Sequence, residues 1–250
     1  MGLADLHIHT FYSWDGTMTP AAVLKSAAMA GLNVIAVTDH DDIRGSRQAL
    51  DLAGKYGMEV IPGSEISTSE GHLLALFVDE HIPAGLSLLE TLTFIGKKGG
   101  LAIAPHPAAI GTPSLSYPSI KAVLAYSGAR RVLCGIEVYN GGLPYRRSNM
   151  LARSFADTLL HPLACVGNSD AHYFWGIGRG VTYFPGRTAA DLRQALINRT
   201  TNAHGAKGVI ALSPVAGWIW HYALKKLGWV TSNVQPHMPL RLARRPVISS

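Results

Sequence analysis

Five short apolar runs in this chain end on a histidine, an aspartate or a glutamate, and this regularity restricts the fold more than any other feature. The runs end at His9, at His40, at Glu65, at His106 and at the pair Asp170 and His172. Apolar runs that alternate with helical segments are typical of parallel strands covered by helices. In a β/α barrel the carboxyl ends of the strands meet on one face, where the active site lies. The pattern therefore predicts an α/β barrel with these polar side chains gathered at one mouth.

The first run, Asp5–Thr10, carries two histidines with one residue between them. Successive side chains of a strand point to opposite faces, so His7 and His9 share one face while Leu6 and Ile8 share the other. An isolated His-x-His pair is more often a surface feature than a metal site. The later runs that also end on metal-ligand residues favour the metal site.

Helix signals separate the runs. Thr19 and Pro20 are typical of a helix start, Gly57 of a helix end, and Thr188 with Asp191 of a capping box. Helices are expected at 20–30, 45–56, up to 98, 118–125, 145–158 and 189–198, and later strands at 33–37, 58–61, 72–78, 101–104, 132–138, 163–166 and 180–184. An open doubly wound sheet is the competing architecture, but the first turn lacks a glycine-rich phosphate loop.

The candidate metal ligands share two chemistries, imidazole and carboxylate, which suit Mn, Zn or Fe ions. They are His7, His9, Asp15, His40, Glu65, His72, His106, Asp170 and His172. One ion cannot bind nine ligands, so the predicted site is multinuclear, with Glu65 as the bridging carboxylate. Asp15 in its Asp-Gly turn and His72 at the start of its run also have structural interpretations. Glu137 and Asn140 are placed outside the ligand set.

Five segments together resemble the PHP family of polymerase- and histidinol-phosphatase-related phosphoesterases. They are Asp5–Thr10, Thr38–His40, Gly63–Glu65, Pro105–Pro107 and Ser169–His172, and the resemblance covers about residues 3–205. It implies a distorted, TIM-like barrel of seven strands, a site of two or three divalent metal ions, and ligand roles for the nine residues. Pro105 departs from the family pattern, in which Ala commonly precedes the His-Pro pair, and should alter the loop without removing the ligand.

The predicted function is metal-dependent hydrolysis of a phosphate ester by a metal-activated water. The substrate class is a small phosphorylated metabolite, a nucleotide or a short oligonucleotide. Asp15 or His172 is the candidate proton donor to the leaving oxygen. Arg179 and Arg44 are the candidate phosphate-binding cations, each with a solvated-surface interpretation of equal weight. The alternatives are an amidohydrolase-type enzyme that acts on C–N or C–O bonds, and an inactive metal-binding scaffold.

Charge divides the chain into a predicted barrel, 1–205, and a basic, tryptophan-rich extension, 206–250. Six of the 22 Lys and Arg residues, and no acidic residue, lie beyond residue 204, so the remaining 16 balance the 16 acidic residues. A basic groove for duplex nucleic acid is therefore not expected. The tryptophans and cations of the extension predict that it docks onto the barrel or onto a second subunit. The alternative is that it anchors the protein at a membrane surface. Two cysteines inside apolar runs indicate a reducing, cytoplasmic location.

Overall fold

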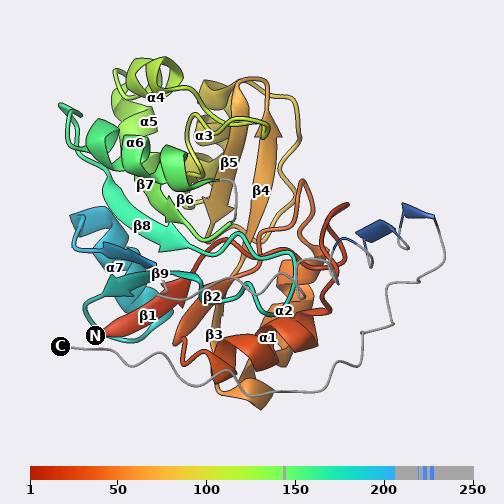
Figure 1. Cartoon of the computed structure of the whole chain (residues 1–250). Coiled ribbons are helices and arrows are strands. Elements are labelled where there is room, and N and C mark those ends of the chain that lie inside the picture. The colour runs from red at the N-terminus through yellow and green to blue at the C-terminus, as the bar shows by residue number, and fades with distance from the viewer. Residues whose placement is uncertain (143–144, 206–218, 220–221, 224–225, 228–250) are drawn as a thin grey trace.

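The computed structural model describes residues 1–142, 145–205, 219, 222–223 and 226–227 (Figure 1). Within them the chain has a mixed α/β fold with two five-stranded sheets. The first sheet has the order β10-β9-β1-β2-β3, with β1 Gly2–Asp5, β2 Val34–Ala36, β3 Glu59–Ile61, β9 Gly180–Phe184 and β10 Asn202–Gly205. The second has the order β4-β5-β6-β7-β8, with β4 Gly63–Thr68, β5 Gly71–Leu76, β6 Leu101–Ala104, β7 Leu133–Asn140 and β8 Ala164–Asn168.

The predicted α/β class is confirmed, whereas the closed seven-stranded barrel is not. The strands are also not all parallel: β5 pairs antiparallel with β4 and β6, and β9 with β1 and β10. The sequence interpretation missed β4, because Pro62 and Gly63 read as a loop after β3. Pro62 has no N–H to donate to a ladder, and the chain resumes at once as β4. It then reverses into β5 at Gly71, whose φ of 134° favours glycine.

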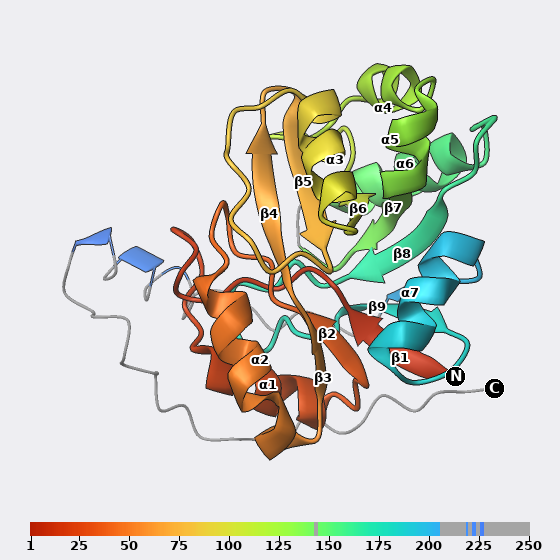
Figure 2. The ribbon, with the colours of Figure 1, turned by 180° about the vertical axis from the view of Figure 1, so that it is seen from behind.

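Seven helices of the described residues pack against these sheets. They are α1 Pro20–Met29, α2 Arg44–Tyr56, α3 Leu88–Lys97, α4 Tyr117–Val123, α5 Ser127–Val132, α6 Arg146–Ala156 and α7 Ala189–Asn198. In Figures 1 and 2, α1 and α2 lie with β2 and β3, and α3 to α6 lie with the second sheet. The predicted Thr19 cap accepts from the Ala22 N–H, and Thr188 and Asp191 form the expected capping box. The short helix α5 was not predicted.

The first run is a strand only as far as Asp5, which corrects the predicted strand Asp5–Thr10. Beyond β1, only Ile8 of this run still pairs in the manner of a strand, through an isolated parallel bridge with Ala171. The His9 N–H donates to Ala171 O at 2.9 Å, and the Thr38 N–H donates to Ile8 O at 2.8 Å. Leu6 and Ile8 are fully buried in the core. The segment that follows β1 is therefore held between the segments that follow β2 and β8.

Most of the predicted extension, 206–250, lies outside the described residues. The described part comprises Ile219, Tyr222, Ala223, Lys226 and Leu227. The domain boundary, the self-association and the membrane-surface hypothesis all stay predictions. No helix among the described residues is long and apolar enough to cross a bilayer.

Gly180 provides a test of how closely β8 and β9 pack. A Cβ at Gly180 would overlap the carbonyl of Asn168, so Gly180→Ala should destabilise the protein by about 1–3 kcal/mol and lower the Tm. The matched control is Gly128→Ala in α5, where the added Cβ would meet no described atom within 4 Å outside its chain neighbours and its own helix backbone. The control should be neutral or slightly stabilising, since alanine favours helix over glycine. Equal melting temperatures for the two variants would contradict this packing.

Candidate metal centre

The carboxylate of Glu65 on β4 is the centre of the site. Its Oε2 lies 3.2 Å from His7 Nε2, 3.4 Å from His9 Nε2 and 3.3 Å from His40 Nδ1. Its Oε1 faces two other imidazoles, His72 Nδ1 at 2.9 Å and His106 Nε2 at 3.2 Å. The two oxygens therefore face different sets of histidines, which is the arrangement expected of a carboxylate that bridges two ions.

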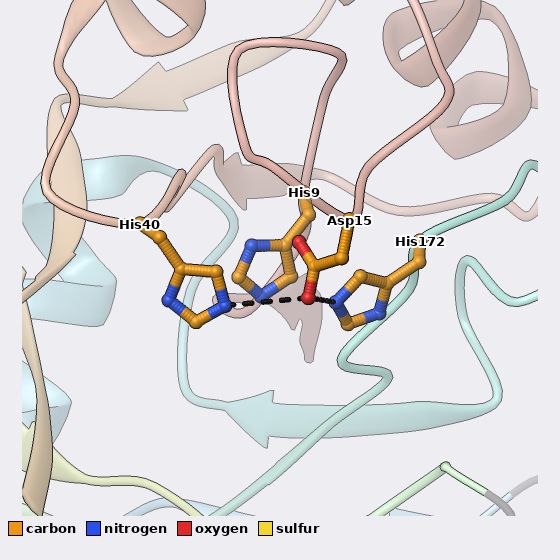
Figure 3. Close-up of side chains that lie close together, drawn as sticks. All are labelled: His9, Asp15, His40 and His172. Atoms are coloured by element: carbon orange, nitrogen blue, oxygen red, sulfur yellow. Dashed lines mark hydrogen bonds and ion pairs between the residues drawn. The ribbon is translucent and has the colours of Figure 1, made fainter. Parts of the chain in front are cut away.

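A second group of ligand-type side chains lies on the His9 side of Glu65. Asp15 Oδ2 is 2.9 Å from His172 Nε2 and 3.5 Å from His40 Nε2 (Figure 3). The rings of His9 and His172 stack with centroids 4.3 Å apart. These four side chains come from the segments after β1, β2 and β8, and each offers one ligand atom within 4.8 Å of the others.

Asp170 joins the two groups. Its Oδ1 lies 3.3 Å from His7 Nε2 and 3.2 Å from His9 Nε2. Asp170 has a φ of 52° and His106 a φ of 28°, both unusual for residues other than glycine. With Pro105 before it, His106 still directs Nε2 at Glu65. Strained backbone of this kind persists only where contacts with the surrounding structure hold it in place. Such residues are common at functional sites.

All nine predicted ligand residues thus lie in one cluster. Within the described part of the chain they form four overlapping groups that could each hold an ion. The groups are His9, Asp15, His40 and His172; His7, Glu65 and His106; His7, His9 and Asp170; and His40, Glu65 and His72.

Four buried side-chain atoms of this cluster support its fit to metal ions. His9 Nε2, Asp15 Oδ1, His40 Nδ1 and His72 Nδ1 have no hydrogen-bond partner of acceptable geometry among the described residues. Buried polar atoms are normally hydrogen-bonded, so unsatisfied ones in one place require an explanation. A ligand bond to a cation would satisfy each of them.

The charges of the cluster stabilise one another. Burial alone would raise the pKa of Glu65, but His7 and His40 outweigh it and hold the pKa well below its usual value. Burial alone would likewise lower the pKa of His7, but Asp170 and Glu65 hold it well above its usual value. Burial and the neighbouring His172 lower the pKa of His9 to about 4. His9 is therefore neutral near pH 7 and has the lone pair that a metal ligand needs.

Hydrogen-bond partners behind the cluster orient its imidazoles. Glu137 on β7 is buried; its Oε1 lies 3.3 Å from His7 Nδ1, and its Oε2 accepts the His106 N–H at 2.8 Å. Ser13 Oγ is 3.0 Å from His9 Nδ1, and Ser114 Oγ is 3.0 Å from His106 Nδ1. Such partners fix the ring orientation and the tautomer of metal-binding histidines. The sequence placed Glu137 outside the ligand set and gave no signal for the two serines.

The two candidate phosphate-binding arginines do not contact the cluster among the described residues. Arg44 pairs with Asp42 at 2.6 Å and lies over the ring of Tyr12. Arg179 donates through Nε to the carbonyl of Trp175 at 3.1 Å. Their substrate-binding role stays a prediction.

An exposed tryptophan instead marks the edge of the cluster. Trp14 precedes Asp15, is 57% exposed and stacks on His40 with centroids 5.7 Å apart. Two residues of the extension contact it: the Tyr222 ring lies edge-on at 6.3 Å, and Lys226 Nζ lies 5.3 Å from the ring centroid. Tyr222 and Lys226 of the extension therefore lie beside the metal centre.

Comparison with known proteins identifies the family. The PHP domain model matches residues 5–159, and the PHP-associated model matches residues 146–201. The first match covers more than half of the chain and includes seven of the nine candidate ligands, from His7 to His106. The second match includes the other two, Asp170 and His172. The chain belongs to the PHP family, as the sequence resemblance indicated.

Three curated relatives illustrate this membership. An uncharacterised protein of Methanocaldococcus jannaschii is 48% identical over 114 residues, 42% of this chain and 67% of that protein. A 5'-3' exoribonuclease of Haemophilus influenzae is 28% identical over 211 residues, 83% of this chain and 67% of the relative. A 3',5'-nucleoside bisphosphate phosphatase of Chromobacterium violaceum is 36% identical over 88 residues, 34% of this chain and 30% of the relative.

A solved structure supports the fold. A two-domain protein of Bacteroides vulgatus, described as containing a PHP-like metal-dependent phosphoesterase, superimposes with a TM-score of 0.64 at 23% identity. The match covers 88% of this chain and 69% of that one. At this identity the likeness shows a shared fold alone.

Glu137 gives a test of the site. Protein purified without chelator and loaded with Mn²⁺ or Zn²⁺ should contain more than one ion per chain by elemental analysis. Glu137→Gln should weaken metal binding about 10–100-fold, because the glutamine cannot hold His7 with a charge-assisted bond. Glu80→Gln, an exposed glutamate paired with Lys98, is the matched control and should bind metal like the parent. A stoichiometry that never exceeds one ion would overturn the multinuclear site.

Proposed function

We propose that the chain hydrolyses phosphate esters with the help of two or three divalent transition-metal ions. The observation that carries this proposal is the buried Glu65 carboxylate, whose two oxygens face separate sets of imidazoles. Imidazole and carboxylate ligands without a thiolate suit Mn, Zn or Fe. A multinuclear centre of this kind is suited to in-line displacement at phosphorus.

The nine residues of the cluster are the proposed ligands. His7, Glu65 and His106 form one group, and His9, Asp15, His40 and His172 form another, with Asp170 and His72 at their borders. When bound, such ions supply Lewis acidity to the phosphoryl group and lower the pKa of water. The chain itself supplies the geometry: Glu137, Ser13 and Ser114 hold the imidazoles that face the ions.

Of the two predicted proton donors, we propose His172 as the group that protonates the leaving oxygen, in a state in which it does not bind an ion. Asp15 is less suited to this role, because, against the effect of burial, its hydrogen bonds to His172 and His40 hold the pKa of its carboxyl well below the usual value. Asp15 and His172 form the most exposed acid–imidazole pair of the cluster, with side chains 13% and 19% exposed. Burial lowers the pKa of His172, but the hydrogen bond to Asp15 and its charge outweigh burial and raise the pKa above its usual value. This shift favours the imidazolium form of His172, which can give its proton to an alkoxide.

The substrate class we propose is a small phosphorylated metabolite, a nucleotide or a short oligonucleotide. The names of two relatives, an exoribonuclease and a nucleoside bisphosphate phosphatase, support phosphate esters of nucleotides. Trp14 beside His40 would offer such a substrate an aromatic surface next to the reacting phosphate. An amidohydrolase reaction is the competing proposal, and a panel that pairs phosphate esters with amide and lactone substrates would separate the two.

Activity should depend on metal and on Asp170. Chelation with EDTA should abolish hydrolysis of a phosphate ester, and added Mn²⁺ should restore it. Asp170→Asn removes the charge that faces His7 and His9, so turnover should fall by at least about 100-fold. Asp51→Asn, the same change on the exposed face of α2, should retain parental activity. Full turnover in Asp170→Asn would show that the site is assigned wrongly.

We also propose that Lys226 and Tyr222 belong to the substrate entrance. Both lie against Trp14, and Trp14 stacks on His40. A cation at this place would attract an anionic ester as it approaches the ions.

Lys226→Gln should therefore raise the KM for a phosphate ester by about two- to fivefold, the range of an exposed ion pair, without changing kcat. Lys25→Gln, which removes an exposed cation from α1, serves as the control. The difference between the two variants should disappear at high salt, because screening removes the interaction. Identical KM values at low salt would contradict a role of Lys226 in substrate binding.

A further inference from the structure

A second site of distinct chemistry lies at the opposite ends of β7 and β8. A cavity of about 450 Å³ is lined by residues that precede these strands and by the end of α7. Its lining includes Arg130 and Arg131 of α5, His161 before β8, and Arg199 after α7. The metal-centre residues follow the other end of β8, which is roughly 13 Å away along the strand. The cavity is therefore separate from the metal centre.

The cavity is basic and its cations are not compensated. Its lining contains three arginines and a histidine but no aspartate or glutamate. In the part of the chain that the structure describes, none of the three arginines forms an ion pair with an acidic side chain, whereas Arg44 and Arg47 both do. Guanidinium groups that gather without acids repel one another, and an anion between them removes that repulsion. The volume lies within the range of small-molecule sites.

One of the arginines is held in place. Arg130 donates through Nη1 to His161 Nε2 at 2.7 Å and to the Leu124 carbonyl at 3.4 Å. His161 Nε2 must accept, because a guanidinium has no lone pair to offer. The other guanidinium nitrogens of Arg130 form no hydrogen bond to a described residue. A half-buried arginine fixed on one side offers its remaining donors to a ligand at a small entropic cost.

An apolar groove adjoins this cavity. The groove, of about 640 Å³, shares Ser127 and Arg131 with the basic cavity. Tyr126 and Ile197 line it and are 57% and 44% exposed. The two spaces together match a molecule with an anionic group at one end and an apolar or aromatic part at the other. The basic extension cannot supply this anion from its side chains, since residues 206–250 contain no aspartate or glutamate.

We propose that this place is a binding site for a phosphorylated small molecule. Arg130, Arg131 and Arg199 bind the phosphate group, and the organic part lies along Tyr126 and Ile197. Arginine matches the geometry of phosphate oxygens with paired N–H donors, which favours phosphate over a single-oxygen anion. The site binds without hydrolysing, because it contains no carboxylate to hold a metal ion and no acid–imidazole pair. It does not depend on the proposed activity of the metal centre.

Amide NMR of the zinc-loaded full-length protein tests the proposal. The probes are inorganic phosphate and phenylphosphonate, whose C–P bond a phosphoesterase does not hydrolyse. The amides of Ser127 and Gly128 should shift with saturation, separately from those of the metal loops. Phenylphosphonate should bind more tightly than phosphate because its ring enters the groove. Equal affinities would overturn the role of the groove.

Two double variants of equal charge change locate the site. Arg131→Gln with Arg199→Asn should weaken phenylphosphonate binding at Ser127 by about tenfold or more. Asparagine is chosen because Arg199 has a φ of 59°, a conformation that asparagine tolerates. Lys25→Gln with Lys55→Gln changes two exposed cations of α1 and α2 and should leave the affinity unchanged. Equal affinity in the arginine variant, or an equal loss in both variants, would show general charge attraction and no site.

Discussion

The structure depends on one buried carboxylate that five imidazoles surround. Glu65 lies near the start of β4, just after the chain passes at Pro62 from β3 of the first sheet into the second sheet. The Glu65 N–H donates to Asp39 O at 3.1 Å, and the Asp41 N–H donates to Glu65 O at 2.9 Å, so the backbone on both sides of the side chain is fixed. A buried carboxylate without partners would be very costly. The histidines around Glu65 come from the segments after β1, β2 and β6 and from β5. Both sheets must therefore come together before the Glu65 carboxylate can be buried among its partners.

A set of buried carboxylates outside the cluster holds the ligand segments to one another. Asp39, next to His40, accepts the Thr10 N–H and hydroxyl at 2.6 and 2.7 Å. Asp5 accepts the N–H groups of Ser169 and Gly178, both at 3.0 Å, and Glu137 accepts that of His106. Burial raises the pKa of Asp5 and of Asp39 to about 6 even with these hydrogen bonds. Each of these carboxylates joins a ligand segment to another part of the chain, which explains how strained residues such as Asp170 are retained.

The sequence predicted which side chains gather in one cluster better than it predicted the architecture, for physical reasons. Histidines and acids at the ends of apolar runs stand out because side chains of this kind rarely follow buried strands without a function. β4 did not stand out, because Gly63, Ser64 and Glu65 have weak strand propensity and follow a proline. Its antiparallel pairing with β5 depends on tertiary contacts that periodicity does not encode. Ser13 and Ser114 were missed for a similar reason, since a serine near a histidine in space has no signature in the sequence.

The arginine-lined cavity and the metal centre differ in what they can do to a phosphate group. Guanidinium groups have no lone pair, so Arg130 and Arg131 of α5 and Arg199 after α7 can hold a phosphate but cannot hold an ion that would activate water. The imidazoles and carboxylates of the metal centre, among them Asp170 and His172 after β8, have lone pairs and can hold such an ion. β7 and β8 are largely buried, and along β8 the cavity and the metal centre lie at opposite ends, roughly 13 Å apart. A phosphate bound at the arginines therefore does not compete for the ligands of the metal centre.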